Sequence, residues 1–333
     1  MPKNGRAFAR VASGLLAGRL PRGLHTGVAV VSVAASSRAP FGDVVKAYVA
    51  LTKPRIIELL LITTVPAMFL AAGGFPPWQL VVWTMLGGLF AAASANTFNC
   101  VIDADIDEVM RRTRRRPVPR HQVSARNATI FGVVLGILAT LVLGFGANWL
   151  SSFLALAANA FYVFVYTMWL KRRTWQNIVW GGIAGCFPPL IGWTAVTGSV
   201  AWPPLILFGI VFLWTPPHTW ALAFRYRDDY AAAGVPMLPV VKPAPYVAAQ
   251  IFWYSLATVA VSLLLWPATP TGWLYPAAAA AFGAVLLWEA AQLWRRARAG
   301  LEVAQLKAMR LFHWSNTYLA LIFLAVALDP LLT

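Results

Sequence analysis

Charged side chains crowd into one short stretch of an otherwise apolar chain. Four polar residues stand just before a basic run at 111–116: Asn99, Asp103, Asp105 and Asp107. On a helix, Asn99, Asp103 and Asp107 lie about one turn apart and share a face, while Asp105 points to roughly the opposite side. Carboxylate and amide oxygens on one face suit Mg²⁺, which prefers one or two carboxylates with phosphate oxygens and water. We therefore predict a metal site at Asn99, Asp103 and Asp107. The alternative is a solvated acidic helix end, although acids oppose the dipole at a helix C-terminus.

A second acidic pair stands further along the chain. Asp228 and Asp229 are followed by Tyr230, just beyond a later apolar run. Taken alone, the pair is typical of an ordinary loop. If it lies on the same membrane face as Asp103, the two acidic groups could hold a diphosphate between two metal ions. Asp228 and Asp229 are therefore further candidate metal ligands, and Tyr230 is a candidate substrate contact.

Basic residues near these acids could bind phosphate oxygens. The candidates are Lys53, Arg112, Arg116, Lys171 and Arg172. The alternative role for any one of them is to fix the membrane orientation, which is what most basic residues beside membrane spans do.

One histidine lies within an apolar run near its charged end. His218 ends the string Trp214-Thr-Pro-Pro-His218. An ionisable group inside a membrane span is a functional candidate. The alternative is a histidine that only hydrogen-bonds to the backbone.

The elements that must position these residues are membrane helices. Hydrophobic residues make up 59% of the chain, and windows of about 20 apolar residues recur along it, which predicts an all-α polytopic membrane protein. Cys100 and Cys186 lie in or beside apolar runs without CxxC spacing, so neither a disulfide nor a zinc site is indicated. Nine transmembrane helices are expected at about 56–73, 79–100, 128–146, 150–170, 177–197, 203–223, 246–266, 272–294 and 311–331.

The positions of the basic residues test this helix map. All 27 Lys and Arg fall either in the segment up to Arg55 or in alternate connections, and intervening connections such as 197–202 carry no charge. The positive-inside rule then places the N-terminus and the charged connections in the cytoplasm. The net charge of +16 reflects this topology, so no nucleic-acid partner is expected. The charged connections are 101–127, 171–176, 224–245 and 295–310.

The chain divides into two parts. Residues 1–45 are basic, with no acid before Asp43, and are expected to form a disordered N-terminal arm or a transit peptide. A secretory signal is disfavoured because it would export the residues beside Lys53. Residues 46–333 form the expected nine-helix domain, in which acid-bearing connections follow the second and the sixth helix.

Several strings resemble a known family. Asn99-x-x-x-Asp103-x-x-x-Asp107 at the end of the second span resembles the first aspartate-rich motif of the UbiA-type intramembrane prenyltransferases. From about residue 45 onward, the chain resembles the branch of that family that farnesylates heme. The strings that carry this resemblance are Leu51-Thr-Lys-Pro-Arg55, Asp103-Ala-Asp-Ile-Asp107, Lys171-Arg with Asn177, Trp214-Thr-Pro-Pro-His218, and Asp228-Asp-Tyr with Ala-Gly-Val-Pro-Met-Leu-Pro239.

The resemblance implies a UbiA-type helix bundle and a reaction. Farnesyl diphosphate would be the donor and a vinyl group of heme B the acceptor, giving heme O with Mg²⁺ as cofactor. Asp103, Asp107 and Lys171 would be catalytic, and His218 would hold the heme by its iron or by a propionate. The second motif is generally D-x-x-x-D in the superfamily, but Ala232 stands four residues after Asp228, which leaves an adjacent pair as in the heme branch.

The substrates and protein partner follow from the resemblance, and the location follows from the Ala-, Gly-, Val- and Arg-rich composition and from the positive-inside rule. Besides the two substrates, the expected partners are the lipid bilayer and, as a candidate, heme A synthase. The expected location is a bacterial cell membrane with the active site on the cytoplasmic side, and the alternative is the mitochondrial inner membrane. A UbiA-type enzyme that prenylates a quinone precursor is the second reading. An ion or solute transporter is the third, disfavoured because the middles of most spans are apolar.

Overall fold

The computed structural model describes residues 40–269 and 271–332, with the side chains at 55, 56 and 58–61 excepted. Within that part of the chain every regular element is helical, and no strand occurs. The basic arm predicted for residues 1–45 lies outside the described residues except for 40–45, where α1 (Phe41–Thr52) begins.

Eight helical segments of the described chain are long and apolar enough to cross a membrane. A further helix, α2 (Pro54–Ala72), stands at the position of the first predicted span. The prediction of an all-helical, multi-pass membrane protein is therefore confirmed. The eight segments are α3 (Trp78–Ile102), α5 (Ala125–Gly146), α6 with η1 (Trp149–Leu170), α7 with η2 and α8 (Asn177–Thr197), α9 (Trp202–Arg225), α12 (Ala244–Ala268), α13 (Leu274–Arg298), and α14 with its flanking turns (Val303–Leu331).

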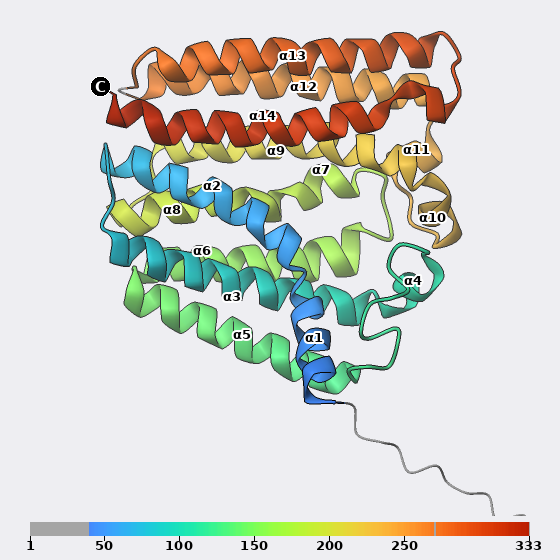
Figure 1. Ribbon diagram of the computed structural model, residues 1–333, viewed down its shortest axis with the longest axis horizontal. Coiled ribbons are helices and arrows are strands. Elements are labelled where there is room, and N and C mark those ends of the chain that lie inside the picture. Colours follow the sequence, from blue (N-terminus) through green and yellow to red (C-terminus); the bar gives the residue numbers. More distant parts are fainter. Residues whose placement is uncertain (1–39, 270, 333) are drawn as a thin grey trace, which may run out of the picture. The chain divides into compact units, whose positions relative to one another are not determined.

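The spans pack side by side in two groups (Figure 1). Helices α9 and α13 each contact both α12 and α14, and α3, α5 and α6 form the other group, with α2 and α8 between them. The two middle helices approach closely at Gly192, where an added Cβ would lie 2.4 Å from the carbonyl oxygen of Thr64. Small residues at such a crossing allow backbones to approach, which is how membrane helices gain packing contacts.

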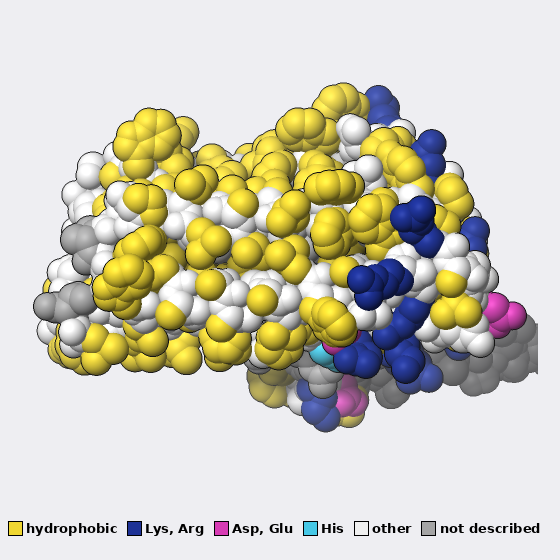
Figure 2. Space-filling view, turned by 90° about the horizontal axis from the view of Figure 1, so that it is seen from above, with side chains coloured by type: hydrophobic (Ala, Val, Ile, Leu, Met, Phe, Trp, Pro, Cys, Tyr) yellow, Lys and Arg dark blue, Asp and Glu magenta, His cyan; other side chains and the backbone are white. Residues whose placement is uncertain are grey.

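The surface is apolar along the spans and basic at one end. Figure 2 shows hydrophobic side chains over most of one face, with Lys and Arg gathered at one end. Large side chains such as Ile137 and Leu264 are more than half exposed, which lipid tolerates and water would not. We call the end at which α3, α9 and α13 finish the charged end.

Short helices at the charged end follow two of the spans. Helix α4 (Ala104–Val109) follows α3, and α10 (Arg227–Ala232) follows α9, each with six residues. Both acid-bearing connections thus begin with a short helix. The short helix α11 (Leu238–Val241) completes this end.

Two predicted spans depart from regular α-helix. After α6 (Trp149–Ala160), the chain winds as a π-helix, η1 (Phe161–Leu170). The next span contains a 3₁₀ segment, η2 (Gly182–Cys186), between α7 (Asn177–Gly181) and α8 (Phe187–Thr197). Pro188 and Pro189 open α8, and because proline has no N–H, they cannot donate the α-helical bonds that would span this segment.

Candidate active site

The acidic motif lies where α3 passes into α4. Asp103 sits at the junction, with φ −90° and ψ 8°. Its N–H still donates to the Asn99 carbonyl oxygen at 3.0 Å, and the Asp107 N–H donates to the Asp103 carbonyl oxygen at 2.8 Å. The three side chains therefore stay on one face although α3 ends and α4 begins between them. Asn99, Asp103 and Asp107 are buried, whereas the Asp105 side chain is 65% exposed, as the helical spacing predicts.

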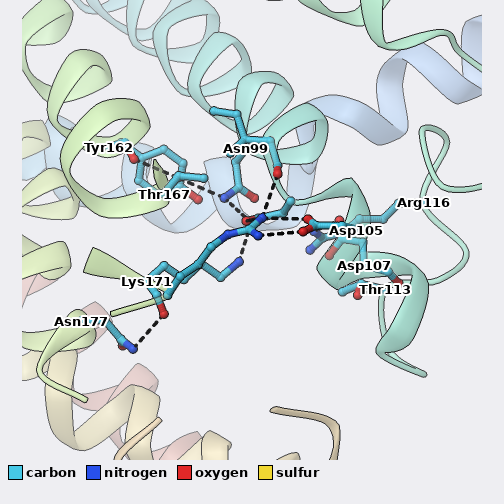
Figure 3. Close-up of polar contacts among 12 residues, drawn as sticks. Asn99, Asp105, Asp107, Thr113, Arg116, Tyr162, Thr167, Lys171 and Asn177 are labelled. Carbon is cyan, nitrogen blue, oxygen red and sulfur yellow. Dashed lines mark hydrogen bonds and ion pairs between the residues drawn. The ribbon is translucent and has the colours of Figure 1, made fainter. Parts of the chain in front are cut away.

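A separate cation contacts each of the three buried groups (Figure 3). Lys53 Nζ donates to Asn99 Oδ1 at 2.6 Å, and Arg116 Nη1 donates to Asp107 Oδ2 at 2.6 Å. Lys171 donates to Asp103 Oδ2. The three cations come from three connections of the chain, so the folding of the bundle assembles the site. Burial lowers the pKa of Lys53 to about 8, because water is removed from its ammonium group.

Asp105 belongs to a different, exposed pair. The Arg172 guanidinium binds both of its carboxylate oxygens at 2.7 Å and also donates to the Ile102 carbonyl oxygen at 3.0 Å. The Arg172 hydrogen bonds lower the pKa of Asp105. Arg172 is 3.9 Å from the nearer oxygen of Asp103, so it lies at the edge of the site.

The π-helix positions the side chains of Thr167 and Lys171 at the site. The Thr167 hydroxyl donates to the Tyr162 carbonyl oxygen at 2.8 Å and accepts from Asn99 Nδ2 at 3.2 Å. The Lys171 N–H donates to the Tyr166 carbonyl oxygen at 2.9 Å, five residues back, as in a π-helix. This wide turn sets the direction in which the Lys171 side chain leaves the helix.

Two buried oxygens in this region have no hydrogen-bond donor among the described residues. They are Asp103 Oδ1 and Asn177 Oδ1. Asn177 is fully buried, and its Nδ2 donates to the Lys171 carbonyl oxygen at 3.4 Å. Buried polar atoms are normally hydrogen-bonded, so Asp103 Oδ1, which has no hydrogen bond and only the ion-pair contact with Arg172 at 3.9 Å, marks a place for a donor or a cation.

The donor set fits a hard divalent cation. Asn99, Asp103 and Asp107 offer only oxygen atoms from one face, as Mg²⁺ prefers. The described residues contain no group of three or more His, Cys, Asp or Glu side chains that could hold a metal by themselves. With two carboxylates and one amide, a metal here would need further oxygens, which a diphosphate and water can supply.

The second acidic pair is split between two environments. Asp229 is buried and accepts from Arg111 Nε at 3.2 Å, which links α10 to the connection after α4. Asp228 is exposed and lines a separate pocket. Tyr230 packs against the large apolar core. The guanidinium of Arg112 lies 5.3 Å from the centre of the Tyr226 ring.

His218 is held between two aromatic rings. Its ring centre lies 4.3 Å from that of Trp214 and 4.5 Å from that of Phe312, on α14 (Ala308–Leu328). Its Nδ1 is 2.9 Å from Ser315 Oγ. The Ser315 hydroxyl also lies 2.8 Å from the Phe312 carbonyl oxygen; when its one proton is donated there, it accepts from His218 and the imidazole proton is on Nδ1. Nε2 then carries a free lone pair.

Sequence reasoning missed several partners in these contacts. Thr167 and Ser315 are ordinary small polar residues inside apolar spans, and nothing in the sequence distinguishes them from packing residues. Arg111 was visible as part of the basic run but could not be matched to Asp229, because the two lie 118 positions apart.

Comparison of sequences places the chain among prenyltransferases. The profile described as the UbiA prenyltransferase family matches residues 60–316. The chain is 72% identical over 290 residues to a Cutibacterium acnes protein named protoheme IX farnesyltransferase, which covers 87% of this chain and 86% of that protein. Proteins of the same name from a Nocardioides species and from Streptomyces coelicolor are 63% and 57% identical, each over 89% of this chain and over 95% and 94% of their own lengths.

Solved structures share the fold. A structure described as digeranylgeranylglyceryl phosphate synthase in membranes has a TM-score of 0.71 and 18% identity, covering 87% of this chain and 100% of its own. A UbiA homologue from Archaeoglobus fulgidus, bound to DMAPP and Mg²⁺, has a TM-score of 0.60 and 16% identity, covering 84% of this chain and 99% of its own. At these identities the likeness concerns the fold of the bundle.

Proposed function

This chain belongs to the UbiA prenyltransferase family, and from that premise we propose that it transfers the farnesyl group of farnesyl diphosphate to a vinyl group of protoheme IX, giving heme O. The observation that carries the proposal is the 72% identity over 87% of the chain with a relative named protoheme IX farnesyltransferase. The acceptor-side chemistry at His218 supports heme over a quinone precursor.

The buried charge cluster is the proposed diphosphate site. Asn99, Asp103 and Asp107 would hold Mg²⁺, which supplies positive charge to the diphosphate oxygens. Lys53, Arg116 and Lys171 already converge on this point through their contacts with the acidic motif. Their cationic groups bind phosphate oxygens and stabilise the negative charge that grows on the leaving group, which is usually the largest catalytic effect in such sites.

The second acidic pair and the outer cations have supporting roles in this proposal. Asp229 holds Arg111 through an ion pair, and Arg112 and Arg172 steer the incoming diphosphate. Tyr230 contacts substrate. Asp228 stands apart from Asp229, so a second metal held by both is the least supported part of the predicted site.

The transfer needs no protein nucleophile. The bond between C1 of the farnesyl group and the diphosphate oxygen breaks, and its electron pair leaves with diphosphate. The terminal vinyl carbon then bonds to C1, and water adds to the other vinyl carbon and loses a proton to solvent. Tyr162 and Tyr166 are four positions apart in the π-helix, and their ring centres are 5.4 Å apart. Their faces can stabilise the allylic cation.

The acceptor is placed by His218. Its Nδ1–H is held by Ser315, so the remaining nitrogen offers a lone pair. A neutral nitrogen lone pair binds iron and repels a carboxylate. Of the two roles predicted for His218, we therefore propose ligation of the heme iron.

The basic connections indicate the orientation. On the face that Figure 2 shows, Lys and Arg gather at the charged end, which by the positive-inside rule faces the cytoplasm. We propose a bacterial cell membrane as the location, with heme A synthase as a candidate partner that receives the product.

The proposal is tested with purified protein, heme B, farnesyl diphosphate and Mg²⁺. We expect a product whose mass equals heme B plus a farnesyl group and water, and we expect it to disappear when EDTA replaces Mg²⁺. Prenylation of 4-hydroxybenzoate with no change in heme B would contradict the proposal and favour the quinone-precursor reading.

A further inference from the structure

A pocket with basic side chains in its wall opens at the charged end, and none of the acidic-motif residues line it. It has a volume of about 420 Å³ and lies between the end of α9, α10 and the start of α14. Three basic side chains line it, Arg225, Arg227 and Lys307, together with the carboxylate of Asp228. Among the described residues, no carboxylate forms a salt bridge with any of the three cations.

Residues that line the pocket lie on the same sides of α9 and α14 as His218 and the ring stacked on it. Arg225 follows His218 by seven residues, so it lies on the same side of α9, at a rise of about 10 Å. On α14, Met309 and Ala308 line the pocket, and they precede Phe312 by three and four residues. Phe312 is the residue that stacks on His218. The imidazole and the pocket therefore lie along the same faces of two packed helices.

Lys307 is fixed in an unusual backbone conformation at the rim. Its φ is 57°, in the left-handed region, where η3 (Val303–Leu306) turns into α14. A residue other than glycine with this φ is strained, and such residues cluster at functional sites. Lys53, in the acidic cluster, has the same feature with φ 54°.

We propose that this pocket binds the two propionate carboxylates of the acceptor, an inference that rests on the proposed function. A porphyrin whose iron is bound at His218 would carry its carboxylates at one ring edge, and in this proposal that edge faces the pocket. Three cations and one carboxylate give the pocket a net charge of about +2, which balances a dicarboxylate. Arg binds carboxylates through paired hydrogen bonds, and the exposed rim lets the carboxylates stay in contact with water.

Paired oxyanions could also come from an anionic lipid headgroup, because the pocket lies at the end of the spans. The two sources differ in one respect that can be controlled. Esterification removes the charge of the propionates without changing the iron, the vinyl groups or the bilayer.

The test compares heme B with its dimethyl ester as acceptors, in nanodiscs of neutral phosphatidylcholine. Arg225→Gln and Lys307→Gln are compared with wild type and with Arg295→Gln, an exposed cation outside the pocket. We expect each pocket variant to raise KM for heme B about tenfold, which corresponds to about 1.4 kcal/mol. KM for the dimethyl ester and for farnesyl diphosphate should stay unchanged, as should all values for Arg295→Gln.

Equal changes in KM for heme B and its ester, or no change for either, would overturn the inference. If the variants lose activity only when phosphatidylglycerol is added to the nanodiscs, and equally with both acceptors, the pocket holds a lipid headgroup and the inference fails. If wild-type protein farnesylates neither acceptor, the proposed function itself fails. Turnover of the ester by the variants shows in the same assay that they are folded.

Discussion

Asp103 and Asp105 are two positions apart and have opposite surroundings. Asp103 is fully buried and contacts Lys171, while Asp105 is exposed and pairs with Arg172. A carboxylate with one unpaired buried oxygen is suited to bind a cation, and a carboxylate in an exposed ion pair contributes little. The two residues therefore form a natural pair of test and control.

We predict that Asp103→Asn lowers heme O formation at least 100-fold, a loss typical of removing one group that stabilises charge in the transition state. The same is expected for Asp107→Asn. Asp105→Asn should change the rate only a few-fold. The measurement is initial rate at saturating Mg²⁺, and near-normal turnover by either of the first two variants would refute the proposed metal site.

The effect of the Lys53 charge and the effect of its backbone conformation can be tested separately. Lys53→Ala and Lys53→Gly both remove the ammonium group that contacts Asn99, so both should lose activity. Only glycine adopts the φ of 54° without steric cost. We predict that Lys53→Gly is more stable than Lys53→Ala by about 1 kcal/mol, measured by thermal unfolding in detergent. Equal stabilities would show that the left-handed conformation is not retained.

For single residues, the sequence predicted which side chains share a helix face better than it predicted which side chains contact each other across the bundle. The spacing of Asn99, Asp103 and Asp107 placed them together because helical geometry is local. The cation contacts depend on which connections meet at the charged end. Lys171 and Asp103 are 68 positions apart, and no local rule relates them.

Among the elements, the π-helix η1 depends on its neighbour α7. A Cβ added at Gly181 would lie 2.1 Å from the Tyr166 ring, whereas Gly185, four residues on, has open space around it. The aromatic ring thus occupies volume that only glycine leaves free. Packing between these two elements fixes the turn that precedes Lys171.

We predict that Gly181→Ala destabilises the protein by about 1 to 3 kcal/mol, the usual cost of overpacking, and lowers activity by displacing Tyr166. Gly185→Ala is the matched control and should leave both quantities nearly unchanged. Thermal unfolding and initial rates test the pair. Similar behaviour of the two variants would show that the Tyr166 contact does not hold η1 in place.

Element existence was predictable, but element type was not always so. Apolar runs of spanning length marked the helices because backbone groups in lipid must be satisfied internally. Periodicity does not separate an α-helix from a π-helix in a segment such as 161–170, where most residues are apolar. Pro188 and Pro189 did offer a visible signal for the interruption at η2.

For the molecule as a whole, the distribution of charge is the strongest topological signal. Basic connections gather at the charged end, while the connection at 197–202 has none. The two native cysteines, Cys100 and Cys186, are free and buried, so a single introduced cysteine can report its own side of the membrane.

We predict that Ser199→Cys is labelled by a membrane-impermeant maleimide in intact bacterial cells. Arg173→Cys should be labelled only after the cells are broken. Both positions are exposed, so the difference would report orientation. The reverse pattern would place the charged end outside and contradict the positive-inside assignment.

The π-helix has a consequence for reading distant relatives of this chain. A π turn takes in about one residue more than the α turn it replaces, so a relative in which one turn of this segment is α-helical instead would be one residue shorter there. Its alignment with this chain should carry a one-position gap within 161–170. If the gap is placed elsewhere, every residue between is shifted by one, and the lysine at 171 is matched to a position that faces about 100° away.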